Sequence, residues 1–179
     1  MAIRGPFGIE KPITSKNVGT VAAGSTVVEY GDGTKHQSVI TVDTALGDIP
    51  GGAELGLGVL VYTFPAGALN VKATYMSMAL TQTDGNITSD VPDIGVGSVV
   101  ASGVVGVLGG TSTFEDMLTG RAADDCDGTA EVAHVATSKL VATGDAHTVY
   151  FNAAYDWTAS GDDACAIAGT IIIEWTFVV

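Results

Sequence analysis

The clearest strand signal lies in Ile167–Val179, whose sequence is IAGTIIIEWTFVV. From Ile171 onward every second residue is large and apolar, whereas Glu174 and Thr176 stand on the alternate face. This period of two predicts a β-strand with one buried face. Because an exposed apolar edge invites aggregation, we expect this strand to lie inside a sheet, with Trp175 in the core.

Seven other segments share this strand character, being rich in β-branched residues and bounded by turn residues. They are Ser25–Tyr30, His36–Val42, Ala53–Phe64, Val71–Gln82, Ile94–Val107, Glu131–Val141 and His147–Trp157. We interpret Ile94–Val107 as one bent strand or two short ones, and the sequence GDGT at 31–34 predicts a hairpin between the first two segments. About eight strands without βαβ alternation predict an all-β fold, an antiparallel, jelly-roll-like β-sandwich.

Two local features depart from this strand pattern. Gly56 and Gly58 share one face of the predicted strand Ala53–Phe64, which indicates close backbone packing or a bulge. The segment Thr113–Thr119 predicts one short helix, because Thr113 is a suitable N-cap and the glycine after the segment can end it.

The first 23 residues differ in composition from the rest of the chain. They contain glycines and prolines, such as Pro6 and Pro12, and show little periodicity. A segment of this kind buries little apolar surface by itself. We therefore expect residues 1–23 to form an extended N-terminal arm and residues 24–179 to form one β-sandwich domain.

The composition argues against several classes of protein. Hydrophobic residues make up 46% of the 179 positions and charged residues 15%, which is unlike a disordered chain. The net charge is −13, and residues 81–179 hold fourteen acidic against two basic side chains. Without a cluster of Lys or Arg, neither nucleic acid nor a membrane surface is an expected partner.

No apolar run is long enough to cross a bilayer and the N-terminus does not resemble a signal peptide, so we expect synthesis in a host cytoplasm.

No sequence motif indicates a catalytic nucleophile. The chain lacks Gly-x-Ser-x-Gly, and none of His36, His134 and His147 has a neighbour that marks it as a general base. The glycines at 95, 97, 103 and 106 lack the Lys-Ser/Thr ending of a phosphate loop, and we interpret them as strand glycines. We therefore expect a protein without enzymatic activity or an organic cofactor.

The two cysteines, Cys126 and Cys165, each stand beside a pair of aspartates. This matched setting predicts that the two loops meet. Three interpretations stay open: buried thiols, which suit a cytoplasmic origin; a disulfide, which a particle released into oxidising surroundings can form; and half of a metal site. A zinc site is the weakest of the three, because the cysteines are far apart in sequence and form no CxxC.

Two acidic loops offer hard oxygen ligands of the kind that calcium prefers. The candidate ligands are Asp84, Asn86, Asp90 and Asp93 in the first loop and Asp124, Asp125 and Asp127 in the second. Neither loop matches an EF-hand, and the simpler interpretation is that these side chains stabilise turns. Calcium is the one cofactor that the sequence leaves open.

Four stretches carry a resemblance to a known group of proteins. They are ELGLGVLVYTFPAGALNVKATYMSMAL, QTDGNITSDVPDIGVGSVVASGVVGVLGG, DDCDGTAEV and AHTVYFNAAYDWTASGDDACAIAGTIIIEW. In this order they resemble small virion structural proteins of tailed bacteriophages, especially marine ones. The likeness covers about residues 36–179 and implies a β-rich particle component, often a head decoration protein, without any site residue to carry over.

We therefore expect a capsid decoration or cement protein on the exterior of a phage head. Its expected partners are the major capsid protein and copies of itself, arranged as a trimer, joined by apolar contacts. The alternative is a tail or fibre component that binds a host surface glycan. For that role the aromatic candidates are Tyr62, Tyr150, Tyr155 and Trp157, although alternation places the last two on the core face.

Overall fold

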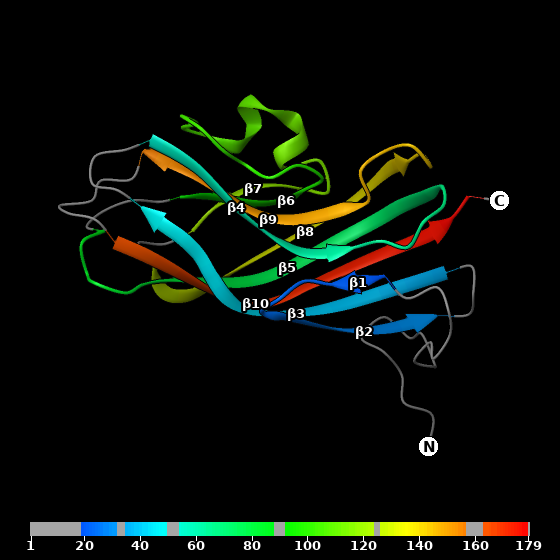
Figure 1. Cartoon of the computed structure of the whole chain (residues 1–179), viewed down its shortest axis with the longest axis horizontal. Coiled ribbons are helices and arrows are strands. Elements are labelled where there is room, and N and C mark those ends of the chain that lie inside the picture. The colour runs from blue at the N-terminus through cyan, green and yellow to red at the C-terminus, as the bar shows by residue number, and fades with distance from the viewer. Residues whose placement is uncertain are drawn as a thin grey trace, which may run out of the picture.

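The computed structural model describes residues 19–31, 35–49, 54–87, 92–123, 126–156 and 163–178. Its strands form two five-stranded antiparallel sheets that pack face to face (Figure 1). Sheet A has the order β2-β3-β10-β5-β8, and sheet B has the order β1-β4-β9-β6-β7. The strands of sheet A are β2 (Ser25–Gly31), β3 (Lys35–Ile49), β10 (Asp163–Phe177), β5 (Leu69–Gln82) and β8 (Asp127–Val141). Those of sheet B are β1 (Thr20–Val21), β4 (Glu54–Thr63), β9 (Thr148–Asp156), β6 (Asp93–Gly97) and β7 (Leu118–Ala122).

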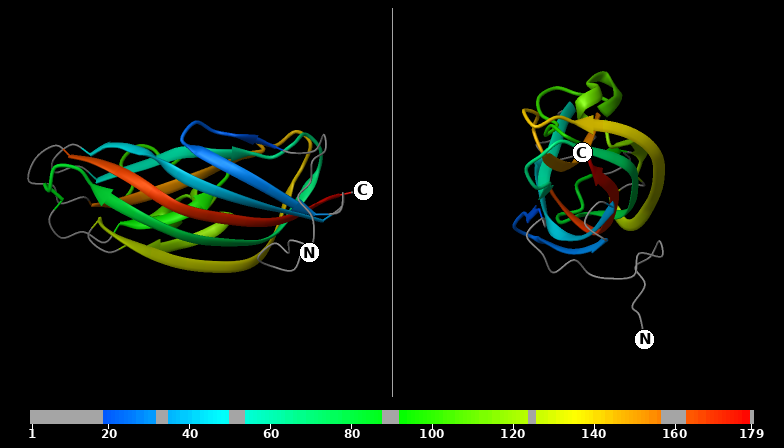
Figure 2. Two further views of the ribbon diagram at one scale, coloured as in Figure 1. Left: turned by 90° about the horizontal axis from the view of Figure 1, so that it is seen from below. Right: turned by 90° about the vertical axis from the view of Figure 1, so that its right-hand side faces the viewer.

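The connectivity from β3 to β10 is that of a jelly roll. β3 pairs with β10, β4 with β9, β5 with β8 and β6 with β7, always antiparallel. These nested pairs form one long hairpin that is rolled over on itself, as Figure 2 shows from below and from one end. The predicted antiparallel, jelly-roll-like sandwich is confirmed.

Strand β10 lies in the middle of sheet A, as its sequence predicts. It pairs with β3 on one side and β5 on the other. Ile171, Ile173 and Trp175 point into the sandwich and are buried. Both edges of the strongest apolar strand are thus covered by ladder hydrogen bonds, which removes an aggregation-prone edge.

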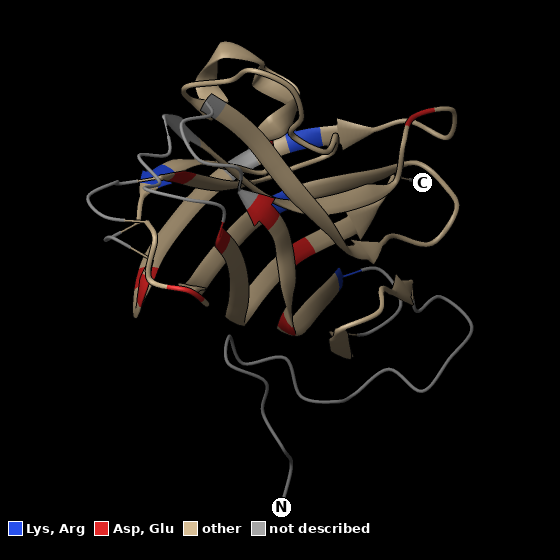
Figure 3. Cartoon of the chain, turned by 60° about the vertical axis from the view of Figure 1, so that its left-hand side comes forward, with Lys and Arg blue, Asp and Glu red and all other residues tan. Residues whose placement is uncertain are grey.

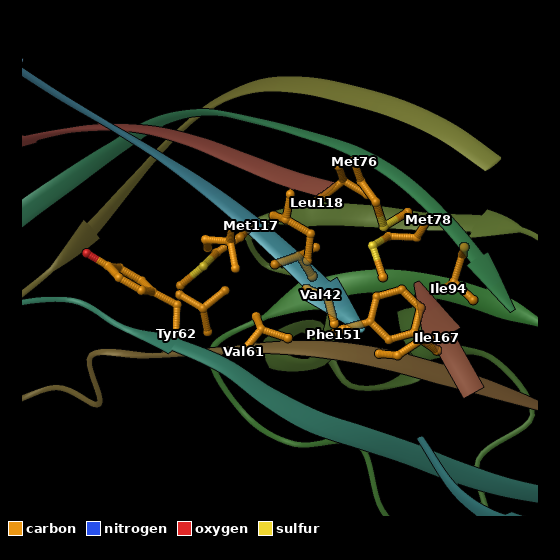
Figure 4. Packing of buried hydrophobic residues seen from close by; sticks show 14 of the residues in the cluster. Val42, Val61, Tyr62, Met76, Met78, Ile94, Met117, Leu118, Phe151 and Ile167 are labelled. Atoms are coloured by element: carbon orange, nitrogen blue, oxygen red, sulfur yellow. The ribbon is translucent and has the colours of Figure 1, made fainter. Parts of the chain in front are cut away.

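The core fills the space between the two sheets. Val42, Met76 and Met78 reach it from sheet A, and Val61 and Phe151 reach it from sheet B (Figure 4). All of these side chains are buried. Each contributes about 1.5–3 kcal/mol relative to an exposed side chain, so the interlocking of the two sheets is the main source of stability.

The structure confirms the predicted hairpin but describes only the end of the predicted arm. β2 and β3 pair from Ser25 to Gly31, so the hairpin is confirmed. Residues 1–18 of the predicted arm lie outside the described residues. At its end, Thr20 and Val21 form β1 and pair with Thr63 and Tyr62 of β4, which joins the segment to sheet B.

Two predictions between residues 94 and 119 are wrong. A strand covers only Asp93–Gly97, and the glycines at 103 and 106 lie in a loop rather than in a strand. The helix predicted at Thr113–Thr119 is a single 3-10 turn at Ser112–Phe114, labelled η2, which follows a similar turn, η1, at Leu108–Gly110. The physical reason is that this segment bonds to the sheet instead of to itself, since the Met117 amide donates to the Val96 carbonyl.

Charge is sparse on the sheets. Figure 3 shows most of the ribbon without charged residues, and the acidic positions lie mainly at strand ends and in the connecting loops. No helix within the described ranges is long and apolar enough to cross a membrane.

Candidate functional site

The segment between β6 and β7 lies as a separate layer on the outer face of sheet B, at the top of Figure 1. Asn152 of β9, which is fully buried, holds it there. The Asn152 Nδ2 donates to the carbonyls of Val99, at 2.9 Å, and Phe114, at 2.7 Å. Its Oδ1 accepts the amide of Ala101 at 2.9 Å. One side chain thus satisfies three backbone groups of the overlying segment.

Glycines in sheet B make this close approach possible. A Cβ at Gly97 would overlap the backbone of Phe114, and a Cβ at Gly58 would overlap the Asn152 side chain. At Gly56 a Cβ would lie 3.0 Å from the Ser102 nitrogen, and the Gly56 amide donates to the Gly103 carbonyl at 2.9 Å. The close packing predicted for Gly56 and Gly58 is therefore present, and it seats the segment directly on the sheet.

The segment carries an exposed apolar surface. We call residues 98–107 the valine loop. Val104 is 79% exposed and Val107 56% exposed, and Val99 and Val100 are also exposed. Beneath the loop, Ala101, Leu108, Phe114 and Ala154 form a small core of their own. The four valines are thus presented on a supported loop rather than on a loose one.

A charged cluster anchors the start of the valine loop. Asp116 accepts the amide of Ser98 at 2.9 Å and its hydroxyl at 2.7 Å. The Lys139 ammonium of β8 pairs with the same carboxylate and lies 3.4 Å from the Ser98 Oγ. Ser98 directly follows β6 of sheet B and Lys139 belongs to β8 of sheet A, so the cluster links the start of the loop to both sheets.

The calcium candidates are only partly described. Asp84, Asn86, Asp93 and Asp127 lie in the described ranges, whereas Asp90, Asp124 and Asp125 lie outside them. Among the residues that the structure describes, no group of three or more His, Cys, Asp or Glu could hold a metal ion. Calcium binding by these loops stays a prediction.

Two of these aspartates bond to nearby backbone. Asp127 accepts the amide of Thr129 at 2.8 Å, and this hydrogen bond lowers the pKa of Asp127. Asp93 accepts the amide of Leu108 at 2.9 Å, while burial raises the pKa of Asp93 against that bond. The first contact is the turn chemistry expected of an aspartate two residues before its donor.

Asp163, which the sequence analysis used only as a neighbour of Cys165, bonds to the first acidic loop. Its carboxylate accepts the amides of Thr83, Asp84 and Asn86, at 3.1, 3.0 and 2.8 Å, and that of Ala164 at 2.7 Å. Burial acts to raise the pKa of Asp163, but these backbone donors outweigh it and lower the pKa to about 2. The loop that leads from sheet A toward sheet B thus wraps around an ionised carboxylate of β10.

The two cysteines meet, as their matched sequence setting predicts. Both are buried thiols, and they flank Gln82 of β5: Cys165 pairs with it, and the Gln82 amide donates to the Cys126 carbonyl at 2.9 Å. A hydrogen bond between the thiols lowers the pKa of Cys165, although burial acts to raise it. A disulfide between Cys126 and Cys165 stays a prediction.

Two of the three histidines and one of the aromatic glycan candidates have structural contacts. His36 is buried and stacks on Trp175 with ring centroids 4.1 Å apart. The two ring nitrogens of His147 each lie 2.8 Å from a backbone carbonyl. Tyr62 is fully buried, so it is unable to stack on a sugar. The side chain of Tyr155, and Trp157, lie outside the described residues.

Sequence reasoning also missed a buried polar network around Glu29 of β2. Its Oε1 accepts the hydroxyls of Ser38, at 2.7 Å, and Tyr62. Trp175 Nε1 donates to the Ser38 Oγ at 2.9 Å, and the Gly19 amide donates to the Tyr62 hydroxyl at 3.1 Å. Burial raises the pKa of Tyr62, and the Glu29 carboxylate adds to this effect. The network ties the β2–β3 hairpin to β4 across the sandwich. Nothing in the alternation around Glu29 predicts it.

The comparisons with known proteins give no family. No family model and no curated protein matches the chain. Among solved structures, the chain is similar to an arabinose-bound α-L-arabinofuranosidase, with 11% sequence identity and a TM-score of 0.32. The match covers 91% of this chain and 25% of that one, so the chain spans about a quarter of the enzyme's length. At this level the likeness carries no argument about function.

Proposed function

We propose that this protein is a non-enzymatic structural component of a bacteriophage particle, a decoration protein that binds the outer shell of the head. The observation that carries the proposal is the valine loop, which exposes four valines on a segment pinned to sheet B by Asn152. The resemblance of the sequence to virion proteins of tailed phages supplies the biological setting.

The valine loop has the properties of a docking surface. Burying one exposed valine is worth about 1.5 kcal/mol or more, so four valines supply several kcal/mol per copy. Because the loop is already held by hydrogen bonds, docking costs little conformational entropy. The same contact repeated over a shell stabilises the whole particle.

The proposed partners are the major capsid protein and further copies of this chain. Residues 98–107 contain no charged side chain, although residues 81–179 are strongly acidic. Like-charged subunits therefore meet through neutral apolar surface, while the carboxylates face solvent. A trimer is the assembly that we propose for the protein on the shell.

The test uses purified particles and the recombinant protein. Quantitative mass spectrometry should find the protein in hundreds of copies, as a shell component requires; a handful of copies would indicate a tail component instead. Light scattering of the protein alone then tests the trimer.

Variants identify the docking surface. We expect the pair Val104→Asp and Val107→Asp to weaken binding to depleted particles at least about a hundredfold, since two charges would be buried. Val28→Asp on the exposed edge strand β2 is the matched control and should bind normally. Equal loss in both variants would contradict the proposed surface.

Salt gives an independent readout of the same contact. Apolar docking should hold or strengthen as sodium chloride rises, because charge repulsion is screened over about 10 Å at 0.1 M salt. Release by salt alone would mean that carboxylates pair with a basic partner. Release by a calcium chelator alone would assign the attachment to the acidic loops.

A further inference from the structure

A groove with a volume of about 340 Å³ lies on the outer face of sheet A, across β5, β8 and β10. This face is on the side of the sandwich opposite the valine loop. The groove falls in the size range of small-ligand sites, which are mostly apolar with a few polar groups. Its shape follows from the strand register.

Two rows of side chains cross the three strands. In the first row Ile172, Tyr75 and His134 stand directly opposite one another. In the next row Ala73 stands opposite Glu174 on one side and Ala136 on the other. Since side chains of a sheet stand roughly perpendicular to it, two alanines beside a row of large residues leave a hollow. Tyr75 and His134 form its wall, and the nearly buried Ile172 forms part of its floor.

A bulge in β5 supplies the remaining wall. The pairing of β5 with both neighbours skips from Val71 to Ala73, which leaves Lys72 unpaired. As a result Lys72 is exposed and lines the groove together with its neighbour Ala73. Bulges of this kind re-aim a side chain next to a functional site.

The chemistry of the groove selects a class of ligand. Lys72 and Glu174 carry opposite charges, so neither a cation nor an anion is favoured overall. The aromatic ring of Tyr75 and the apolar floor suit the flat C–H face of a ring, while Lys72, His134 and Glu174 offer hydrogen-bond donors and acceptors at the rim. A neutral ring with one apolar face and a rim of hydroxyls satisfies all of these groups.

We propose that this groove binds one pyranose ring of a neutral glycan. The inference goes beyond the proposed docking function and is independent of it, because the two surfaces lie on opposite sheets. On a particle, a subunit docked through the valine loop would present the groove to the surroundings.

The test begins with the full chain labelled with ¹⁵N. It is titrated with the methyl glycosides of glucose, galactose and mannose, in both anomers, up to about 50 mM, since a single ring is expected to bind with a Kd on the order of 1 mM. A printed array of neutral glycans is probed in parallel. We expect amide shifts at residues 72–75, 134–136 and 172–174 for at least one sugar, and stronger retention of a glycan that contains it.

Variants separate groove binding from loss of the fold. Tyr75→Ala should weaken binding about tenfold, whereas Tyr30→Ala, on β2 at the opposite edge of sheet A, should leave it unchanged. Ala136→Leu fills the hollow from an exposed position and should abolish binding, with Ala168→Leu as the exposed matched control on β10. The proposal is overturned if no sugar shifts these amides and no glycan is retained, or if Ala136→Leu binds as well as the wild type. Normal particle binding in that case would leave the decoration function standing.

Discussion

The two outer faces of the sandwich are built from residues of different size, and this difference decides what each face can do. Sheet B presents Gly58, Gly97 and Asn152, and a segment of the same chain lies directly on them. Sheet A presents Tyr75 and Ile172, and the groove of about 340 Å³ lies on this face. Small residues thus allow a third layer, whereas large ones keep the sheet open.

The two faces also differ in what holds each proposed binding surface in position. On sheet B the proposed docking surface lies one layer outside the sheet, and hydrogen bonds such as those from Asn152 hold it there. On sheet A the proposed glycan groove is formed by the sheet itself, and its shape depends on strand register and on the bulge at Lys72. We therefore expect single substitutions beneath the valine loop to displace that loop. Substitutions in the core beneath the groove should change the shape of the groove little.

The largest expected effect comes from adding a side chain between sheet B and the segment that covers it. In Gly97→Val the new side chain overlaps the Phe114 backbone, and overpacking of this kind should lower the free energy of unfolding by about 3 kcal/mol or detach the segment. Urea denaturation and limited proteolysis between residues 98 and 117 measure the two outcomes. The control, Thr41→Val on the exposed face of β3, should change stability by less than about 0.5 kcal/mol. A Gly97→Val protein as stable and protease-resistant as wild type would contradict the layered packing.

The next largest effect comes from removing the hydrogen bonds by which Asn152 holds the segment. Asn152→Ala leaves the Ala101 amide and the carbonyls of Val99 and Phe114 without their partner, and it should cost about 2–3 kcal/mol. Hydrogen exchange should rise in the valine loop and stay low in sheet A. Asn70→Ala is the matched change on sheet A, where Asn70 accepts one exposed hydrogen bond from Ser138. A similar cost in both variants would remove the special role of Asn152.

The smallest expected effect lies at the connection between the two sheets. Asp163→Asn should destabilise the protein by about 2 kcal/mol at pH 7, because an amide is unable to accept all the backbone donors that the carboxylate holds. The pKa of Asp163 is lowered to about 2 from 3.8, so its stabilising contribution is present above about pH 4 and is lost as the pH falls toward 2.

The pH dependence makes this prediction specific. The difference between the wild type and Asp163→Asn, measured by urea denaturation, should therefore shrink between pH 4 and pH 2. The control Asn70→Ala removes an exposed hydrogen-bonding side chain without any ionisable group, so its difference from the wild type should stay constant over this range. A difference between the wild type and Asp163→Asn that is constant across this range would contradict the assignment of an ionised Asp163.

Sequence reasoning recovered the fold because the sandwich depends on alternation. The alternate positions of Ile171, Ile173 and Trp175 identify a buried face, and the structure places all three in the core. It failed where the chain leaves the sheet. The apolar run Ile94–Val107 predicts a strand throughout, but the strand ends at Gly97 and Val99, Val100, Val104 and Val107 are exposed on the loop that follows. Composition alone does not distinguish a buried apolar run from an exposed one.

The candidate sites were harder to predict, because each depends on contacts between distant residues. Asn152 stands in an alternating strand where a polar residue normally faces solvent, and only the overlying segment explains it. The groove depends on the register of three strands and on a bulge at Lys72. Neither feature is predictable from a single sequence. The aspartates beside each cysteine did predict that Cys126 and Cys165 meet. Cys126 directly precedes β8 and Cys165 lies near the start of β10, and both stand beside Gln82 of β5.

The central place of β10 has a consequence for the order of folding. β3 and β5 become joined in one sheet only when β10, about eighty residues after the end of β5, enters between them. Until then each has an unpaired edge, and the contacts that complete sheet A span most of the chain. Proteins dominated by such distant pairings refold in milliseconds to seconds rather than microseconds. A nascent chain that has not yet presented β10 is the species most exposed to aggregation, and a chaperone that covers the edges of β3 and β5 would raise the yield of native protein.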